Sequence, residues 1–397
     1  MTRPPPRSMT APAESVPPDP ASDRAFVMIA GGGTGGHVYP AIAVADELVR
    51  RGRDLDEVRF LGSARGLEAT AVPAAGYGID LLPGRGFRRS LTPAAIVQNL
   101  RTVWDTAVAI TRAVAVLRSR RPRVVFGVGG YAAAPGVLAA RCLRIPTVVH
   151  EQNAAPGVVN RVAVALGARA AVSLPGTPLR RATLTGSPVR AEIAAGGRTG
   201  ASDAREGADA PEHTPGRGIG VFGGSLGARR VNDATLGLAR LWRDRPDVVI
   251  RHVTGRRDYQ RCVDEWARRP VGDDALRYEL VDYEDNMADL YARADVVVTR
   301  AGAVTVAELA VAGVPAVMVP LPGAPSDHQT ANARALVDAG AAVLLPDEEC
   351  DGPRLARELD ALLGDRDRLA AMRHGASDLA RPDAAARVAD LIVATAR

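Results

Sequence analysis

The sequence predicts an α/β protein with two doubly wound, parallel-sheet domains that face each other across a cleft. The chain has 397 residues, enough for two domains of roughly 150–200 residues each. Short apolar, β-branched runs alternate with amphipathic helical stretches, which is typical of parallel sheets covered by helices on both faces. Both halves also open alike, with an apolar strand, a glycine cluster (29–37 and 221–230) and a helix.

The expected strands follow one another in both halves, and helical patterns of roughly 10–25 residues separate many of them. In the first half they lie at 26–32, 58–63, 79–83, 124–130, 147–152, 170–174 and 183–188. In the second half they lie at 218–225, 248–255, 278–283, 296–302, 315–321 and 342–346.

Shifts in composition predict the domain boundaries. Residues 1–23 contain seven prolines and no apolar run, so they predict a disordered leader and not a signal peptide. The first domain is expected over 24–190 and the second over 219–380. Between them, 194–218 lacks Val, Ile, Leu, Met and aromatic residues, which predicts a flexible linker or insertion. An amphipathic helix is expected at 382–397.

Composition excludes several classes of function. All 50 basic residues are Arg, which rules out a P-loop, a pyridoxal Schiff base and any catalytic lysine. The three cysteines lie far apart in the sequence, so we expect neither structural zinc nor a disulfide framework. We expect the protein to work in the reducing cytoplasm. The net charge of +5 is too diffuse for nucleic acid and suits phosphorylated or acidic partners. Glycine and proline interrupt the longest uncharged runs, which predict buried strands and turns instead of membrane spans.

The first glycine cluster contains the spacing G-x-G-x-x-G at Gly31, Gly33 and Gly36. A dinucleotide site also needs an acidic residue after the second strand, and the segment LGSAR has none there. The turn then either brings backbone amides to an anion or sugar, or is a tight turn without a ligand. His37 follows the turn and is a candidate general base.

Polar residues follow other predicted strands. Glu151 and Asn153 come directly after the strand TVVH, where ligand-facing residues of an α/β sheet belong, and Glu151 is a second candidate base. The second glycine cluster, with Ser225, predicts a diphosphate cradle to which Arg190 adds positive charge.

Two further segments have both a functional and a structural interpretation. Thr305 and Glu308 fit a capping box, but Glu308 also suits the hydroxyls of a ribose. The segment DHQTANA (327–333) offers His328, Gln329 and Asn332 to a polyhydroxylated ligand, or is an ordinary helix start capped by Asp327.

Seven motifs, in order along 25–395, resemble the MurG family of bacterial N-acetylglucosaminyltransferases. They are GGGTGGHVYPAIAVA, FGVGGYAAAPGVLAA, HEQNAAPGVVNR, TGSPVR, GGSLGARRVN, DNMADLYARADVVVTRAGAVTVAEL and DHQTANA. The resemblance implies a GT-B fold, two Rossmann-like domains around a deep cleft, with the last helix returning to the first domain. Only the leader and 194–218 fall outside it.

The resemblance also implies roles for individual residues. The diphosphate and acceptor side is lined by Thr34, Gly35 and Gly36, and the donor is contacted by Asn153, Arg190 and Ser225. The nucleoside and diphosphate are held by Ala303, Val304, Thr305, Val306, Ala307 and Glu308, with Glu308 on the ribose. Gln329 reads the GlcNAc hydroxyls. Glu284 stands at the uracil-contacting position, often Ile in the family, and Thr330 stands where some relatives have a second Gln.

The implied activity is the inverting, metal-independent transfer of GlcNAc from UDP-GlcNAc to the MurNAc 4-hydroxyl of lipid I, without a cofactor. The product is lipid II, for peptidoglycan synthesis and hence cell shape and division. The lipid acceptor implies a peripheral place on the cytoplasmic face of the cell membrane. Its anionic surface would meet residues 81–91 (LLPGRGFRRSL), which are otherwise a solvated loop. The alternatives are a GT-B enzyme with another lipid or small aglycone acceptor, a sugar-nucleotide epimerase, and a non-catalytic sugar-nucleotide-binding protein.

Overall fold

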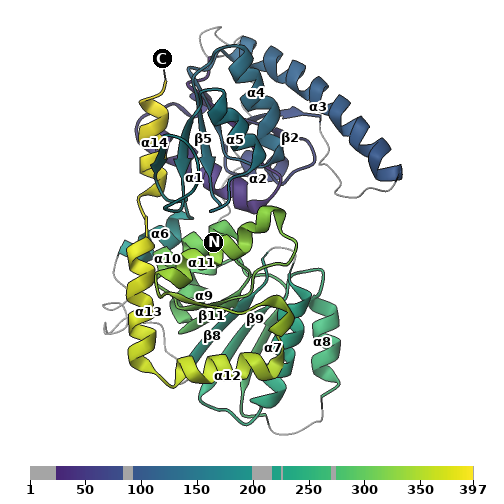
Figure 1. Cartoon of the computed structure of the whole chain (residues 1–397), viewed down its shortest axis with the longest axis vertical. Coiled ribbons are helices and arrows are strands. Elements are labelled where there is room, and N and C mark those ends of the chain that lie inside the picture. The colour runs from purple at the N-terminus through teal and green to yellow at the C-terminus, as the bar shows by residue number, and fades with distance from the viewer. Residues whose placement is uncertain (1–23, 84–92, 199–216, 225–226, 270–273, 397) are drawn as a thin grey trace, which may run out of the picture.

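Two α/β domains, each built on one parallel sheet, make up the computed structural model of the chain (Figure 1). The structure describes residues 24–83, 93–198, 217–224, 227–269 and 274–396. Every strand range expected from the sequence overlaps a strand of the structure, which confirms the predicted α/β fold class.

The N-terminal sheet has the order β3-β2-β1-β4-β5-β6-β7. Its strands are β1 (Val27–Ala30), β2 (Val58–Ser63), β3 (Gly78–Leu82), β4 (Val124–Gly127), β5 (Thr147–Glu151), β6 (Arg169–Val172) and β7 (Ala182–Leu184). Its helices are α1 (Gly35–Arg50), α2 (Glu68–Ala74), α3 (Pro93–Arg120), α4 (Ala134–Cys142) and α5 (Val158–Ala165). Because β1 and β4 are neighbours, the strand order reverses direction beside the turn after β1, where α/β sheets bind ligands.

The C-terminal sheet repeats this plan with the order β10-β9-β8-β11-β12-β13. Its strands are β8 (Arg217–Phe222), β9 (Val248–Val253), β10 (Arg277–Val281), β11 (Val296–Thr299), β12 (Ala316–Met318) and β13 (Ala342–Leu344). Its helices are α7 (Arg229–Leu241), α8 (Tyr259–Ala267), α9 (Met287–Arg293), α10 (Ala303–Ala312), α11 (His328–Asp338), α12 (Gly352–Leu363) and α13 (Arg366–Leu379). The reversal lies between β8 and β11, beside the second glycine turn and the start of α10.

The connection between the domains differs from the expected linker. Residues 194–198 complete helix α6 (Ala191–Arg198), which packs against α9 and α10 and buries Ile193 in the core of the C-terminal domain. Residues 217 and 218 already belong to β8. The expectation of a linker over the whole of 194–218 is therefore wrong at both ends, and 199–216 lie outside the described residues. The small residues at 194–198, which suggested a linker, lie in a helix because Ile193, just before them, anchors α6 in the core.

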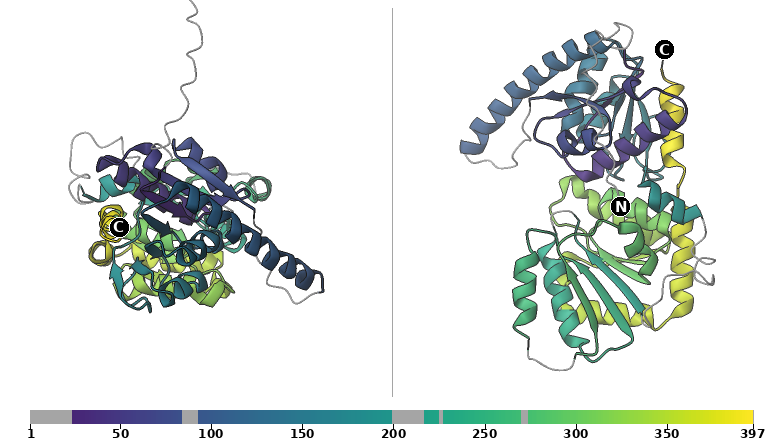
Figure 2. Two further views of the ribbon diagram at one scale, coloured as in Figure 1. Left: turned by 90° about the horizontal axis from the view of Figure 1, so that it is seen from above. Right: turned by 180° about the vertical axis from the view of Figure 1, so that it is seen from behind.

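The chain returns to the N-terminal domain at its end. Helix α14 (Ala384–Val393) lies beside α1 (Figures 1 and 2). Its residues Val388 and Ile392 are fully buried in the N-terminal core. The spacing of these side chains places them on one helical face. Among the described residues, no helix has the length and apolar character needed to cross a membrane.

Candidate active site

The first glycine turn joins β1 to α1 and faces the other domain. Gly32 and Gly33 have φ values of 149° and 93°, a region that favours glycine. Helix α1 begins directly after Thr34, and the first amides of a helix have no partner within it. A methyl group built on Gly36 would stand 4.0 Å from Cγ2 of Val304, in the first turn of α10. The starts of α1 and α10 therefore lie opposite each other between the domains.

His37 stands in the first turn of α1, at a cavity of about 540 Å³. The cavity lies between the first glycine turn, the turn after β2, the end of β3, helix α3 and the segment from Gly130 to Pro135. Burial lowers the pKa of His37 below its ordinary 6.5, and the charges of Glu151 and Glu68 oppose this shift. The imidazole is consequently neutral at pH 7, with Nδ1 3.2 Å from Thr34 Oγ1, so the ring is able to accept a proton.

Glu151, at the end of β5, is buried and holds the loop that follows it. One carboxylate oxygen accepts hydrogen bonds from the backbone and side-chain amides of Asn153, at 3.0 and 3.3 Å. The other accepts from Gly157 N and Asn160 Nδ2, at 2.9 and 2.8 Å. With both oxygens occupied, the arrangement favours a positioning role for Glu151 over the catalytic role that the sequence suggested.

The same loop is bonded to the C-terminal domain. Asn332, fully buried on α11, accepts from Ala154 N at 2.8 Å. Its Nδ2 donates to Asn153 Oδ1 and to Ala301 O, both at 3.1 Å. The sequence placed Asn332 among residues facing a ligand, but in the structure its side-chain amide makes hydrogen bonds between the two domains.

Arg190 and Glu308 come together between the two domains. Arg190 Nε lies 3.6 Å from Glu308 Oε1, and its guanidinium lies 5.3 Å from the centre of the Tyr39 ring on α1. Glu308 Oε2 accepts from Tyr291 Oη at 3.0 Å, whereas Oε1 is buried and accepts no hydrogen bond. Burial raises the pKa of Glu308, while Arg190 and Tyr291 oppose the shift. A buried acceptor that receives no hydrogen bond within the protein suits a ligand hydroxyl.

The capping-box interpretation of Thr305 and Glu308 is wrong. Helix α10 begins at Ala303, with Gly302 as its N-cap, so Glu308 lies inside the helix. Its carboxylate bonds to Tyr291 of α9 and not to the helix start.

The start of α10 presents its backbone to the domain gap. No acidic residue lies in its first turn, so the positive end of the helix dipole is not neutralised there. Of the residues expected at the nucleoside and diphosphate, Val306 and Glu308 are buried and the others are half-buried: Ala303, Val304, Thr305 and Ala307. This arrangement suits an anion such as a diphosphate.

Two more predicted residues are held by their neighbours. Gln329 Oε1 accepts from Leu321 N at 2.9 Å, which leaves the side-chain NH₂ as a donor. The Glu284 carboxylate accepts from Arg251 Nη2 at 2.9 Å and from Asn286 N at 3.1 Å. The Glu284 side chain is thus bound within the protein, which suits recognition of a base by backbone groups at this position.

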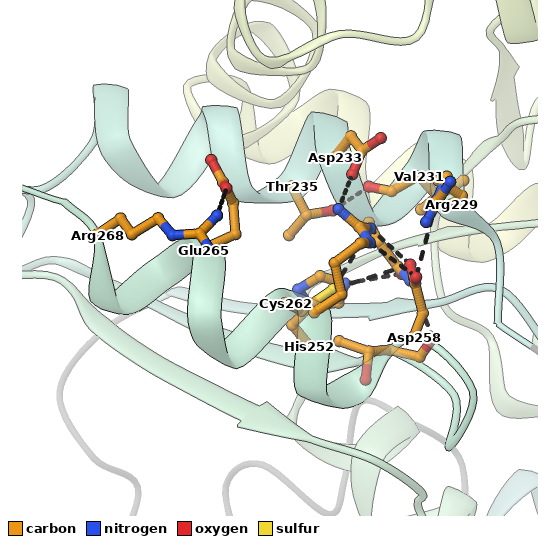
Figure 3. A network of polar contacts seen from close by, with 12 residues as sticks. Arg229, Val231, Asp233, Thr235, His252, Asp258, Cys262, Glu265 and Arg268 are labelled. Carbon is orange, nitrogen blue, oxygen red and sulfur yellow. Dashed lines mark hydrogen bonds and ion pairs between the residues drawn. The ribbon is translucent and has the colours of Figure 1, made fainter.

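A polar network that includes His252 and Asp258 lies in the C-terminal domain beside the second glycine turn (Figure 3). Ser225 lies outside the described residues, but a Cβ at Gly227 would stand 2.1 Å from the O atom of Thr254, so the residue that follows β9 lies directly against the turn. Asn232 donates to Thr254 O at 3.0 Å and to Asp258 Oδ2 at 2.8 Å, and its Oδ1 lies 3.0 Å from His252 Nε2. Burial lowers the pKa of His252 to about 3, so the ring stays neutral. The network fastens the turn to the sheet.

Sequence reasoning missed Tyr39, Glu68 and Tyr291. The aromatic residues gave no signal because their partners lie in other elements. Glu68 gave none because it opens α2, beyond the tip of β2 at Ser63 where a ribose-binding acid would stand. Among the described residues, no group of three His, Cys, Asp or Glu side chains is placed to hold a metal ion.

Comparison with known proteins identifies both domains. Residues 27–172 match the glycosyltransferase family 28 N-terminal domain, and residues 219–388 match the glycosyltransferase family 28 C-terminal domain. The crystal structure of Acinetobacter baumannii MurG is similar, with a TM-score of 0.71, 32% identity, and coverage of 93% of this chain and 99% of that one. The calicheamicin glycosyltransferase CalG4, at 18% identity and a TM-score of 0.67 over 94% of this chain and 98% of that one, shares the fold.

Relatives of similar length carry one name, UDP-N-acetylglucosamine--N-acetylmuramyl-(pentapeptide) pyrophosphoryl-undecaprenol N-acetylglucosamine transferase. The protein from Alkalilimnicola ehrlichii is 44% identical over 94% of this chain and 99% of its own length. The protein from Methylococcus capsulatus is 42% identical over 91% of this chain and 96% of its own length. On this similarity over nearly the whole chain, and on the two family 28 domains, the protein belongs to the MurG family of GT-B glycosyltransferases.

Proposed function

We propose that the protein transfers GlcNAc from UDP-GlcNAc to the MurNAc 4-hydroxyl of lipid I and forms lipid II. The curated relatives are named for this transfer, and they match over nearly their whole length. The observation that carries the proposal is the meeting of the two helix starts, because it places His37 on one side of the gap and Glu308 with Arg190 on the other.

The acceptor side supplies the base. The MurNAc hydroxyl attacks the anomeric carbon from the side opposite the leaving UDP, which inverts that carbon and gives a β-1,4 bond. In this reaction Nδ1 of His37 carries the ring hydrogen and donates it to Thr34 Oγ1, 3.2 Å away, so Nε2 is the atom that takes the hydroxyl proton. The cavity beside His37 accommodates the acceptor sugar.

The donor side stabilises the leaving group. As the glycosidic bond breaks, negative charge develops on the UDP diphosphate. The starts of α1 and α10 and the Arg190 guanidinium stabilise that charge, together with Ser225 in the second glycine turn. Glu308 Oε1 accepts a ribose hydroxyl, since no protein donor uses it. Gln329 directs its NH₂ to the GlcNAc hydroxyls, and backbone groups near Glu284 contact uracil.

The test measures transfer of radiolabelled GlcNAc from UDP-GlcNAc to a lipid I analogue, with small aglycones and a glycolipid lacking the muramyl group in parallel. Label in lipid II alone is the expected result. Label on another acceptor, or conversion of UDP-GlcNAc without any acceptor, would instead support the other GT-B glycosyltransferases or the epimerase. Family membership favours neither of these.

The protein acts as a peripheral enzyme at the cytoplasmic face of the membrane in this proposal, because lipid I is anchored there by its polyprenyl chain. Residues 81–91 combine apolar side chains with Arg85, Arg88 and Arg89. Within this segment, Leu81 is exposed, whereas Leu82 is buried in the N-terminal core. The expectation that the whole segment meets the membrane is therefore wrong for Leu82. The arginines lie outside the described residues.

We expect Arg88→Glu combined with Arg89→Glu to reduce sedimentation with anionic vesicles, because each charge near an anionic surface contributes about 1 kcal/mol. Transfer to a short-chain soluble acceptor should persist. The matched control reverses two exposed charges of the C-terminal domain, Arg366→Glu and Arg368→Glu on α13. Equal vesicle binding by the 88/89 variant and the wild type would place the membrane contact elsewhere.

A further inference from the structure

A second buried carboxylate lies behind the cavity wall that carries His37. Glu68 opens helix α2 and is 1% exposed. Its Oε2 accepts a hydrogen bond from Gly33 N at 2.6 Å, and its Oε1 accepts from Ser63 N at 2.8 Å. One side chain therefore fastens the first glycine turn to the end of β2.

Three glycines leave the space that this carboxylate fills. A Cβ on Gly32 would stand 2.1 Å from Glu68 Cδ, one on Gly62 2.6 Å from Cγ, and one on Gly66 2.0 Å from Oε2. They come from the first glycine turn, from β2 and from the turn after β2, and all three line the cavity. The absence of side chains at these three glycines thus leaves the space in which Glu68 lies against the first glycine turn.

The position of Glu68 changes what the first glycine turn is able to bind. In nucleotide-binding α/β domains, backbone amides after the first strand receive a phosphate. Here the Gly33 amide is already occupied by an anion that belongs to the protein. A phosphate at the Gly33 amide itself would meet this buried negative charge, so the amides at the start of α1 are the ones left for a ligand anion.

We propose that Glu68 is a positioning residue: it holds the Gly33 amide and thereby sets the orientation of His37 toward the acceptor hydroxyl. The inference rests on the proposed function, because it assigns the cavity beside His37 to the acceptor sugar.

Glu68 also acts on His37 through its charge. Glu151 and Glu68 favour the protonated form of the imidazole, and His328 disfavours it. The charge of His37 in turn lowers the pKa of His150, and Thr34 bonds Nδ1. Removing the Glu68 charge should therefore lower the pKa of His37 further. Loss of packing alone has no such electrostatic signature.

Glu68→Gln keeps the side-chain volume but puts an NH₂ where an acceptor stood. We expect kcat to fall by about 10²-fold through misorientation of the base, with the KM for UDP-GlcNAc unchanged. The acidic limb of the pH–rate profile should move to lower pH, since the base loses its proton at lower pH. Glu68→Asp keeps the charge but is too short to reach both amides, so it should lower kcat with a smaller shift of that limb.

The matched control is Asp46→Asn on α1, which also removes a carboxylate acceptor, from Tyr77 Oη at 2.6 Å, away from the cavity. Titration of the His37 ring by NMR, assigned with a His37→Gln variant, gives a readout independent of turnover. Wild-type kcat with an unshifted His37 titration in Glu68→Gln would overturn the inference, as would losses no different from those of Asp46→Asn. Failure of the wild type to form lipid II would overturn the proposed function, and the NMR titration would still test Glu68.

Discussion

At the scale of single residues, the site depends on charged side chains buried beside the gap between the domains and on the bonds that each makes. Glu151 and Glu68 use both oxygens on backbone or amide donors of the protein, so they hold loops in place. Glu308 keeps one buried oxygen without a hydrogen bond, and the contact of Thr34 with Nδ1 of His37 leaves Nε2 for the acceptor hydroxyl in the proposed reaction. A side chain with an atom that the protein does not bond is able to bind or react with substrate. A side chain whose oxygens are all bonded within the protein holds other groups in position.

We expect His37→Ala to lower kcat by about 10²- to 10⁴-fold, the usual contribution of a general base, with UDP-GlcNAc affinity largely unchanged. In the wild type, kcat/KM should fall as pH decreases through a pKa below 6.5, because burial favours the neutral ring and protonation removes the base. Steady-state kinetics over a range of pH tests both. His374→Ala, an exposed histidine on α13, is the control. Near-normal turnover in His37→Ala would remove His37 from the role of base.

Glu308→Gln should weaken UDP binding about 5- to 150-fold, because Tyr291 bonds the remaining oxygen and an NH₂ replaces the acceptor of the ribose hydroxyl, at a cost of about 1–3 kcal/mol. Calorimetry with UDP measures this, with Glu265→Gln on the surface of α8 as control. Unaltered affinity would show that the ribose lies elsewhere.

The same variant tests the buried charge. Because the folded-state pKa of Glu308 is raised above its ordinary 4.5, the unfolded state loses its proton first as pH rises. The contribution of Glu308 to the free energy of unfolding therefore falls as pH rises above about 4.5, and it levels off above the folded-state pKa. The wild-type minus Glu308→Gln difference, from denaturant unfolding without UDP, should follow that decline. A difference independent of pH would contradict it.

At the scale of elements, α11 is the part of the C-terminal domain that bonds the loop after β5. Asn332 donates to two oxygens and accepts from one amide, so both its Nδ2 and its Oδ1 take part in the contact. Aspartate would keep the acceptor for Ala154 N but would set a carboxylate against the oxygens of Asn153 and Ala301.

Stability should therefore decrease in the order Asn332, Asn332→Ala, Asn332→Asp, with about 1–3 kcal/mol lost in the alanine variant. Urea unfolding gives the order, and solution X-ray scattering should show the domains farther apart in both variants. Turnover should fall with them, since Asn153 loses its orienting bond. The control is Gln260→Ala on α8, whose side chain makes an exposed bond to Asp264. Alanine and aspartate variants of equal stability would contradict this account of the contact.

At the scale of the whole molecule, the chain crosses between the domains more than once. The segment after β7 leads into the C-terminal domain through α6, and α14 returns from α13 to pack on α1 (Figure 1). The N-terminal core is thus completed by the last helix of the chain, while UDP contacts are expected mainly from the C-terminal domain.

Ile392→Ala should lower the free energy of unfolding of the N-terminal domain by about 2–5 kcal/mol, because the side chain is fully buried against α1. UDP binding should survive at temperatures where the C-terminal domain stays folded. Calorimetric unfolding with and without UDP separates the two domains. Val393→Ala, next to it but exposed, should change stability by less than about 0.5 kcal/mol. Equal effects of the two substitutions would show that α14 does not stabilise the N-terminal core.

Local patterns were sufficient for the fold class and for part of the site. Alternating strand and helix periods predicted both sheets, because a parallel sheet needs continuous apolar runs and crossover helices. The glycine turns, His37 and the segment from His150 to Asn153 were visible because each directly follows a strand, and the carboxyl ends of parallel strands meet at one edge. The boundaries at 194–198 and 217–218 were missed, since Ile193 anchors α6 through a contact with another element.

The sequence by itself determined the two-domain α/β architecture and which segments reach the cleft, because these follow from short-range periodicity and turn chemistry. Only the tertiary structure decided what each polar side chain does there. Glu308 bonds to Tyr291 of α9 and does not cap its own helix. Asn332 bonds to the loop of the other domain. Glu68 bonds to the first glycine turn in a space left by glycines from separate segments. The physical reason is that a buried carboxylate or amide must be paired, and chain topology chooses its partner.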